Sequence, residues 1–264
     1  GCSTLLVVLS HCRPVPKESP VNLKILSCDI FRDELAEAAK GSPHTLDILN
    51  IEIEKCHEKP KQGHLVVQAA IDDTVGSGFD ALLLGYGLCG RLMVGIEARD
   101  IPLVIPRTHD CLGVLFGSSK KYMDFFLSHP GTYYLSGGWI THAGKSGGEL
   151  ASQMQLGEIS FEYAELVEQY GEDNAVYLSQ VMGGWEQHYQ HAALVVQPGE
   201  DAEELRNQAT KLTASKGWDV EIVEGSLDLL RRWVNGEWPD EEFITVQPGQ
   251  KVIESNDESI LIVE

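Results

Sequence analysis

Two short runs of apolar residues, each followed at once by a loop that carries a cysteine, constrain the fold of this chain more than any other feature. The runs are Ala81–Leu84 and Ile101–Ile105. The first enters the glycine-rich loop Gly85–Gly90, and the second enters the loop Pro106–Cys111. Short apolar runs bounded by turn residues are typical of strands buried on both faces of a parallel sheet. Because ligands of open α/β sheets bind beyond the carboxyl ends of the strands, the two loops predict a shared site.

The same alternation of strand and helix patterns continues along the chain. Further strands are expected at Leu5–Leu9, Leu23–Ser27, Leu46–Ile53, Thr132–Leu135, Ala192–Gln197, Val220–Val223, Phe243–Val246 and Ile260–Val263. Helices are expected at Phe31–Lys40, Gly63–Val75, Arg91–Ala98, Leu112–Phe116, Lys120–Ser128, Glu149–Tyr170, Asn174–Tyr189, Glu203–Lys216 and Ser226–Asn235. This alternation predicts an α/β fold with a mainly parallel sheet, helices on both faces and right-handed crossovers.

Three regions are expected along the chain. Residues 1–22 would form an N-terminal strand and connector, and residues 23–148 an α/β domain that carries the cysteine and histidine site. Residues 149–264 would form a helical segment followed either by a second, smaller α/β lobe or by an extension of the first sheet. The sequence patterns leave these two arrangements open.

The charge of the chain excludes some classes of partner. Its formal net charge is −20, from 40 acidic and 20 basic residues. Nucleic acids and anionic membranes both require a basic face, so neither is an expected partner. No apolar stretch approaches the roughly 20 residues that span a bilayer. Six cysteines in 264 residues are too few and too scattered for a disulfide scaffold, which predicts a reducing, cytoplasmic compartment.

Thiol and imidazole side chains gather at the expected ends of successive strands. Cys28, Cys89 and Cys111 are candidate metal ligands, with His57 and His109 as nearby nitrogen donors. Thiolate and imidazole together suit zinc, and three cysteines also suit an iron–sulfur cluster with one open iron corner. The sequence does not decide between these two cofactors. Cysteine also packs as a small apolar residue in protein cores, which is the structural alternative.

A metal-free mechanism uses the same residues. Two thiols that face each other across a cleft can move a proton on carbon, and one thiolate can attack a carbonyl group. In that mechanism His109 would act as a base with Asp110 near it. In the metal-dependent mechanism, His57 or His109 would be a fourth ligand or a proton shuttle, and Arg107 would hold the carboxylate or phosphate of a small substrate.

Glycine-rich segments flank the candidate site. Gly87, Gly90 and Trp139 are candidates to line a cofactor site, and the segment Gly137–Gly148 is expected to form a mobile loop or lid. The end of this segment imitates a phosphate-binding loop. However, Trp139 occupies the position where that loop requires its first glycine, so nucleoside triphosphate binding is not expected.

Several of these segments together resemble a known family. They are Cys28 at a strand end, the turn His57–Pro60, the loop Gly85–Gly90, the stretch Pro102–Ser118 and the stretch Pro130–Trp139. They are similar to an uncharacterised prokaryotic family that is labelled only a domain of unknown function and is often associated with gene clusters for corrinoid-dependent methyl transfer. The resemblance implies a site at the cysteine loops and, as possible partners, a methyltransferase or a corrinoid protein.

Three functions are therefore compared. The leading hypothesis is a metal-dependent lyase, transferase or hydrolase that acts on a small anionic or methylated molecule. The second is a metal-free racemase, lyase or hydrolase that uses a cysteine thiolate. The third is a non-catalytic accessory protein that carries a metal or a small ligand to a methyltransferase.

Overall fold

The first sheet of the computed structural model contains five strands, of which four are parallel. The structure describes residues 19–52, 60–142, 172, 189–255, 257 and 259–264. The strands are β1 (Asn22–Cys28), β2 (Thr45–Ile51), β3 (Ala81–Gly85), β4 (Leu103–Pro106) and β8 (Phe243–Val246). Their order is β2-β1-β3-β4-β8, and only β8 runs antiparallel to its neighbour. All residues of β3 and β4 are buried, as the uninterrupted apolar runs predict.

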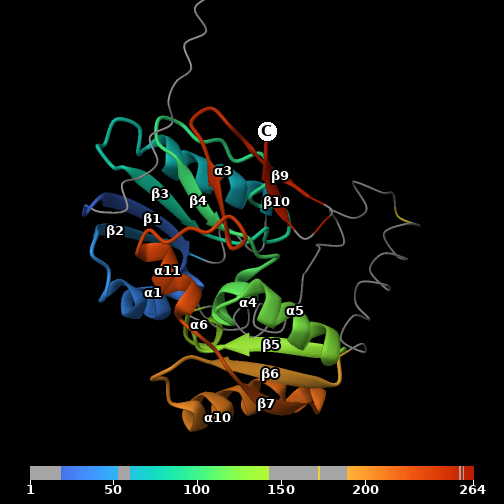
Figure 1. Cartoon of the computed structure of the whole chain (residues 1–264). Coiled ribbons are helices and arrows are strands. Elements are labelled where there is room, and N and C mark those ends of the chain that lie inside the picture. The colour runs from blue at the N-terminus through green and yellow to red at the C-terminus, as the bar shows by residue number, and fades with distance from the viewer. Residues whose placement is uncertain (1–18, 53–59, 143–171, 173–188, 256, 258) are drawn as a thin grey trace, which may run out of the picture.

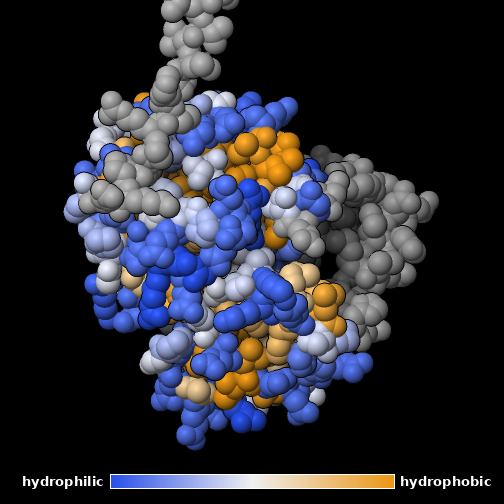
Figure 2. Space-filling view, in the orientation of Figure 1, coloured by the Kyte–Doolittle hydropathy of each residue, from blue (hydrophilic) through white to orange (hydrophobic). Residues whose placement is uncertain are grey.

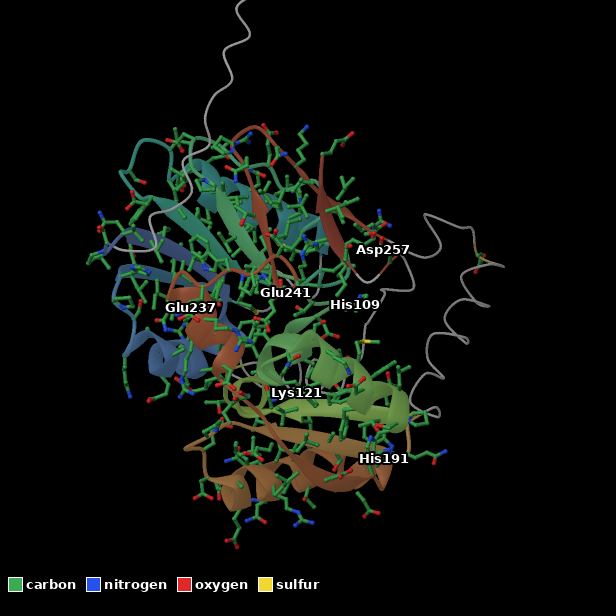
Figure 3. The ribbon with its side chains drawn as sticks, in the orientation of Figure 1. His109, Lys121, His191, Glu237, Glu241 and Asp257 are labelled. Carbon is green, nitrogen blue, oxygen red and sulfur yellow. The ribbon has the colours of Figure 1, made fainter. Side chains whose placement is uncertain are left out.

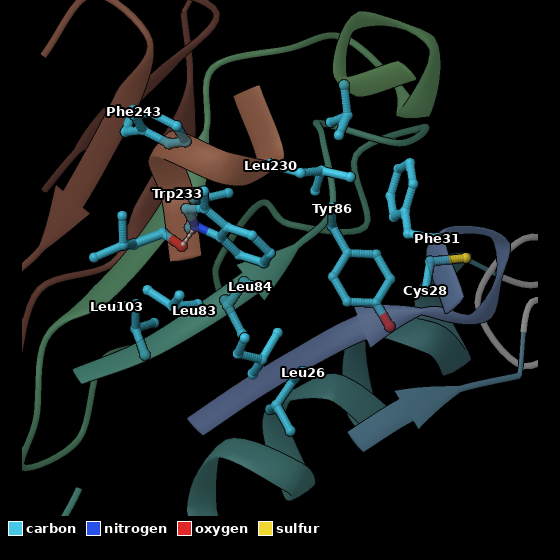
Figure 4. Close-up of a cluster of buried hydrophobic side chains, with 14 of the residues drawn as sticks. Leu26, Cys28, Phe31, Leu83, Leu84, Tyr86, Leu103, Leu230, Trp233 and Phe243 are labelled. Atoms are coloured by element: carbon cyan, nitrogen blue, oxygen red, sulfur yellow. Dashed lines mark hydrogen bonds between the residues drawn. The ribbon is translucent and has the colours of Figure 1, made fainter. Parts of the chain in front are cut away.

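Helices cover both faces of the first sheet (Figure 1). Helix α3 (Pro60–Asp72) lies on one face. On the other face lie the short η1 (Asp29–Phe31), α1 (Arg32–Ala39) and α11 (Asp228–Val234), and α1 contacts α11. The buried cluster beneath α11 contains Trp233, whose indole Nε1 donates a 3.2 Å hydrogen bond to the Val104 carbonyl (Figure 4). The outer surface of α1 and α11 is largely hydrophilic (Figure 2).

A second, smaller sheet lies beside the first (Figure 1). It contains the parallel strands β5 (Thr132–Ser136), β6 (His191–Val196) and β7 (Asp219–Glu224). Its outer face packs against α10 (Ala202–Thr213), which continues into η3 (Ala214–Lys216). A layer of short helices lies between the two sheets: α4 (Cys111–Leu115), α5 (Ser119–Ser128) and α6 (Gly137–His142). The antiparallel pair β9 (Val252–Glu254) and β10 (Leu261–Val263) completes the described elements.

The predicted fold class is confirmed, and the two open arrangements of the last third both occur in part. Strands β6 and β7 form the second sheet, whereas β8 extends the first. The second sheet also takes in β5, which precedes residue 148. The chain therefore moves from the first sheet to the second and then back.

Two local predictions were wrong. The expected helix Arg91–Ala98 is instead a series of turns, because Arg91 and Gly95 have left-handed φ values of 73° and 87°. Its backbone pairs with a distant segment, where Gly95 N donates to the Val252 carbonyl at 2.7 Å. The expected loop at Gly137–Gly148 begins with helix α6, while residues 143–148 lie outside the described residues.

Some expected elements lie outside the residues that the structure describes. These are the strand at Leu5–Leu9, the helix at Glu149–Tyr170 and nearly all of the helix at Asn174–Tyr189. Within the described part of the chain, no helix has both the length and the apolar character that crossing a bilayer requires.

Candidate cysteine site at the carboxyl edge of the first sheet

The three predicted cysteines follow three neighbouring strands. Cys28 is the last residue of β1, Cys89 follows β3, and Cys111 begins α4 just after β4. Because β1, β3 and β4 are adjacent and parallel, their carboxyl ends lie at one edge of the sheet. Cys28 is buried in the main core, and Cys89 and Cys111 are half-buried against it.

The loops that carry Cys89 and Cys111 are joined directly by their backbones. Leu88 N donates to the Thr108 carbonyl at 2.8 Å, and Cys89 N donates to the His109 carbonyl at 2.9 Å. This close approach requires a glycine at position 87, because a Cβ there would lie 2.6 Å from Thr108 Oγ1 and 2.9 Å from Asp110 N. Gly87 thus serves to bring the two loops together.

The backbone at Cys89 adopts a conformation that is rare for a residue with a side chain. Cys89, Gly90 and Arg91 have φ values of 46°, 61° and 73°, so three consecutive residues are left-handed. The turn is held where Leu92 N donates to the Cys89 carbonyl at 3.2 Å and where Arg91 pairs with Glu254 at 2.6 Å. Residues with such unusual backbone conformations concentrate at functional sites. The conformation of Cys89 therefore adds to the case, made first from its thiol, that it is a site residue.

The surroundings of Cys111 favour its protonated thiol. Burial is the main cause that raises the pKa of Cys111 well above its ordinary value, and the negative charges of Asp110 and Cys89 raise it further. A hydrogen bond with the Trp139 side chain acts in the opposite direction but does not reverse the shift. Cys111 is therefore a neutral thiol near pH 7 unless another group takes its proton.

Asp110 is built into the structure through both of its oxygens. Its Oδ1 accepts a 2.9 Å hydrogen bond from Leu112 N and so caps α4, and its Oδ2 accepts a 3.1 Å hydrogen bond from the Tyr122 hydroxyl. Burial raises the pKa of Asp110, whereas these two hydrogen bonds lower it in part. The neighbouring His109 is exposed and lies above α4 and α5 (Figure 3).

The side chain of Arg107 donates to backbone carbonyl groups, whereas the sequence analysis expected it to hold a substrate anion. Its Nε donates to the carbonyls of Asp240 and Phe243, at 2.7 and 3.2 Å. Its Nη1 donates to the carbonyls of Ser259 and Leu261. The guanidinium thus ties the carboxyl end of β4 to the C-terminal strands, and burial lowers its pKa.

The other residues that the sequence analysis proposed for the site have different outcomes. Trp139 joins the site through its contact with Cys111, and Gly87 and Gly90 shape the loop backbone. His57 lies outside the described residues. Among the side chains that the structure describes, no group of three or more His, Cys, Asp or Glu residues is placed to hold a metal ion. The geometry joins the loops of two predicted ligands but presents no ready-made three-ligand set.

Sequence reasoning missed a buried carboxyl group near this edge of the sheet. Glu34 on α1 is 4% exposed, and neither of its oxygens has a hydrogen-bond partner among the described residues. Burial is the main cause that raises its pKa from 4.5 to about 8, and the charge of Glu200 adds to the shift. The spacing of Glu34 from Phe31 and Ala38 places it on the apolar face of α1, which was a usable signal.

The chain was also compared with known proteins. No curated protein sequence matches it. A solved structure, the thioesterase domain from the curacin biosynthetic pathway, is 14% identical, covers 83% of this chain and 89% of its own, and has a TM-score of 0.21. That score supports no statement about fold or activity. A family model matches residues 54–234, which is more than half of the chain. The chain therefore belongs to the family described as Protein of unknown function (DUF1638).

Proposed function

We propose that this protein is an enzyme that acts on a small molecule at the carboxyl edge of the first sheet, with a metal centre held by cysteine thiolates. Cys89 and Cys111 would be the first two ligands and Cys28 the third, around either zinc or an iron–sulfur centre. The observation that supports this most is the pair of hydrogen bonds joining the Cys89 loop to the Cys111 loop. Ligands drawn from separate strand ends are compatible with a catalytic metal that keeps one open position.

The raised pKa of Cys111 bears on both the metal-dependent and the metal-free hypotheses. A thiol with a raised pKa is a poor nucleophile at neutral pH, because only the thiolate attacks. A metal ion displaces the proton of a coordinating thiol, so metal binding would supply the thiolate that burial disfavours. A metal-free mechanism at Cys111 would require a separate base.

Cys28 would have to approach the other two cysteines when the metal binds. It lies in the buried cluster with Phe31 and Tyr86 (Figure 4), and the described residues hold no three-ligand set. β1 pairs directly with β3, so Cys28 at the end of β1 lies on the strand next to the one that leads into the Cys89 loop. The proposal therefore includes a local rearrangement at the end of β1.

The proposed substrate and partner come from the family that the sequence resembles. We propose a small anionic or methylated substrate, and a methyltransferase or corrinoid protein as partner, on the strength of the gene association of the family that the sequence resembles. Arg107 is left out of the proposed substrate contacts, since its Nε and Nη1 donate to backbone carbonyls. His109 is exposed beside the two cysteine loops and is the proposed proton carrier.

Metal analysis of protein purified without oxygen tests the proposal. The expected result is close to one metal centre per chain, with visible absorption for an iron–sulfur cluster and none for zinc. Cys89→Ser and Cys111→Ser should each lose most of the metal, and Cys28→Ser should lose part or all of it. Cys12→Ser is the matched control, because Cys12 is outside the proposed ligand set, and it should keep its metal.

Two other results would favour the competing functions. Metal-free protein with one rapidly alkylated cysteine and turnover of a small substrate would replace the metal mechanism with a thiolate mechanism. Copurification with a methyltransferase, together with bound metal and no turnover, would indicate an accessory protein.

A further inference from the structure

A second candidate binding site lies at the carboxyl ends of β6 and β7. A cavity of about 320 Å³ opens there, lined by Pro198 after β6 and by Glu224 and Gly225 at the end of β7. Its volume is near the lower end of the roughly 300–1,000 Å³ of small-molecule sites. Phe116, which follows α4, also lines it, so the cavity lies at the opposite end of α4 from Cys111. It occupies the position in the second sheet where parallel sheets bind ligands.

The charged side chains around the cavity are balanced. Lys121 and Arg231 provide two positive charges, and Glu224 and Asp228 provide two negative charges. This neutral group stands out in a chain whose net charge is −20. Arg231 and Asp228 are 3.7 Å apart and about half exposed, so their ion pair is weak and both can turn to a ligand. Lys121 lies on α5 in the helical layer between the sheets (Figure 3).

A buried amide lies behind Gly225, one of the residues that line the cavity. Gln197 is 4% exposed, and its Nε2 donates a 2.9 Å hydrogen bond to the Leu115 carbonyl. Its Oε1 has no partner among the described residues. The amide lies against Gly225, where a Cβ would be 2.4 Å from Nε2 and 2.9 Å from Oε1.

The floor of the cavity is fixed before any ligand binds. The Leu115 carbonyl accepts from Ser226 N at 2.9 Å as well as from Gln197. Gly225 N donates to the Val196 carbonyl at 2.8 Å. A site that is already ordered loses less conformational entropy when a small ligand binds.

We propose that this cavity binds a small zwitterion of the size and chemistry of a free amino acid. Its carboxylate pairs with Lys121 and Arg231, and its ammonium group pairs with Glu224 and Asp228. A simple anion would meet two carboxylates in a strongly acidic chain, and a simple cation would meet two cationic side chains. A molecule that carries both charges satisfies both halves of the site.

Calorimetric titration of the full chain with each standard amino acid tests the proposal. At least one amino acid should bind, and Lys121→Ala and Arg231→Ala should each raise its Kd severalfold, as expected for loss of an exposed charged contact. Lys120→Ala is the matched control, because Lys120 neighbours Lys121 but pairs with Asp124 at 2.6 Å and does not line the cavity. All three side chains are on the surface, and circular dichroism confirms that each variant is folded.

Two derivatives of the best-bound amino acid separate the two halves of the site. The carboxamide lacks the negative charge, and the N-acetyl derivative lacks the positive charge, so both should bind severalfold more weakly than the parent by the same argument. Equal binding of either derivative would overturn the proposal by indicating a site for one charge only. Binding of no amino acid, or equal binding by wild type and the Lys121 and Arg231 variants, would also overturn it.

Discussion

The Tyr122 hydroxyl donates a 3.1 Å hydrogen bond to Oδ2 of Asp110, directly beside the thiol of Cys111. The other carboxylate oxygen caps α4 through Leu112 N. The negative charge of Asp110 also raises the pKa of Cys111. One carboxylate therefore fixes the start of α4 and helps to keep the neighbouring thiol protonated.

Asp110→Asn should lower the pKa of Cys111, because it removes a negative charge and retains an oxygen that can cap α4. Alkylation of Cys111, followed by mass spectrometry across a pH series, should accelerate at lower pH than in the wild type. Asp124→Asn is the control, since Asp124 is an exposed residue of α5 that pairs with Lys120. Identical pH profiles for wild type and Asp110→Asn would contradict the assigned electrostatic role.

Gly87→Ala should destabilise the protein by separating the two cysteine loops. The added Cβ would meet Thr108 Oγ1 at 2.6 Å and the Asp110 backbone nitrogen at 2.9 Å, and backbone cannot move aside as a flexible side chain can. Overpacking of this kind costs about 1–3 kcal/mol of unfolding free energy, which urea denaturation measures. Gly41→Ala is the control because nothing lies within 4 Å of its added Cβ. A similar effect of both substitutions would contradict the role of Gly87.

The fold and the meeting of two cysteine loops could be predicted because both depend on local signals. The apolar runs that became β3 and β4 are consecutive in sequence and adjacent in the sheet, so the loops after them had to meet. The turns at Arg91–Ala98 could not be predicted in this way. Gly95 N and Ala98 N donate to the carbonyls of Val252 and Gln250, and such distant backbone partners leave no local sequence pattern.

The structural role of Arg107 could not be predicted either, because its partners are distant backbone carbonyls. The burial of Glu34, in contrast, could have been predicted. The carbonyls that Arg107 binds belong to residues from Asp240 to Leu261, and a carbonyl gives no sign in the residue type. Glu34 lies four residues before the buried Ala38 on α1 and three residues after Phe31, which ends η1. This helical spacing would have placed its carboxyl group on the buried face of α1, although the sequence analysis did not use it.

Arg107→Ala should loosen the C-terminal strands. Removing the guanidinium leaves the carbonyls of Ser259 and Leu261 without this donor, and a hydrogen bond to a charged group contributes about 1.5–3 kcal/mol. Hydrogen exchange, read by mass spectrometry, should therefore accelerate in residues 259–263. Arg99→Ala is the control, because Arg99 pairs with Asp72 at 2.6 Å and with Glu97 at 2.9 Å, and both partners lie outside residues 259–263. Unchanged exchange in Arg107→Ala would contradict the structural role assigned to this arginine.

The pKa of about 8 at Glu34 sets how this one group contributes to the pH dependence of stability. Between about pH 4.5 and about pH 8, folded Glu34 holds a proton that the unfolded chain has lost. The folded state then binds more protons, so the contribution of Glu34 to the unfolding free energy falls as pH rises through this window. The limiting slope for one group is about 1.4 kcal/mol per pH unit, and above the window the contribution is constant.

Glu34→Gln should remove this pH dependence, because an amide of nearly the same shape does not titrate. The variant should exceed the wild type in unfolding free energy by an amount that grows from about pH 5 to about pH 8, as urea denaturation would measure. Glu37→Gln on the same helix is the control, since Glu37 is exposed and pairs with Lys40. For each variant, the difference in unfolding free energy from the wild type is plotted against pH. The curves for Glu34→Gln and Glu37→Gln separate only if a buried, unpaired carboxyl group on α1 must lose its proton inside the fold. Parallel curves would mean that Glu34 is solvated or paired in solution and that its pKa is ordinary.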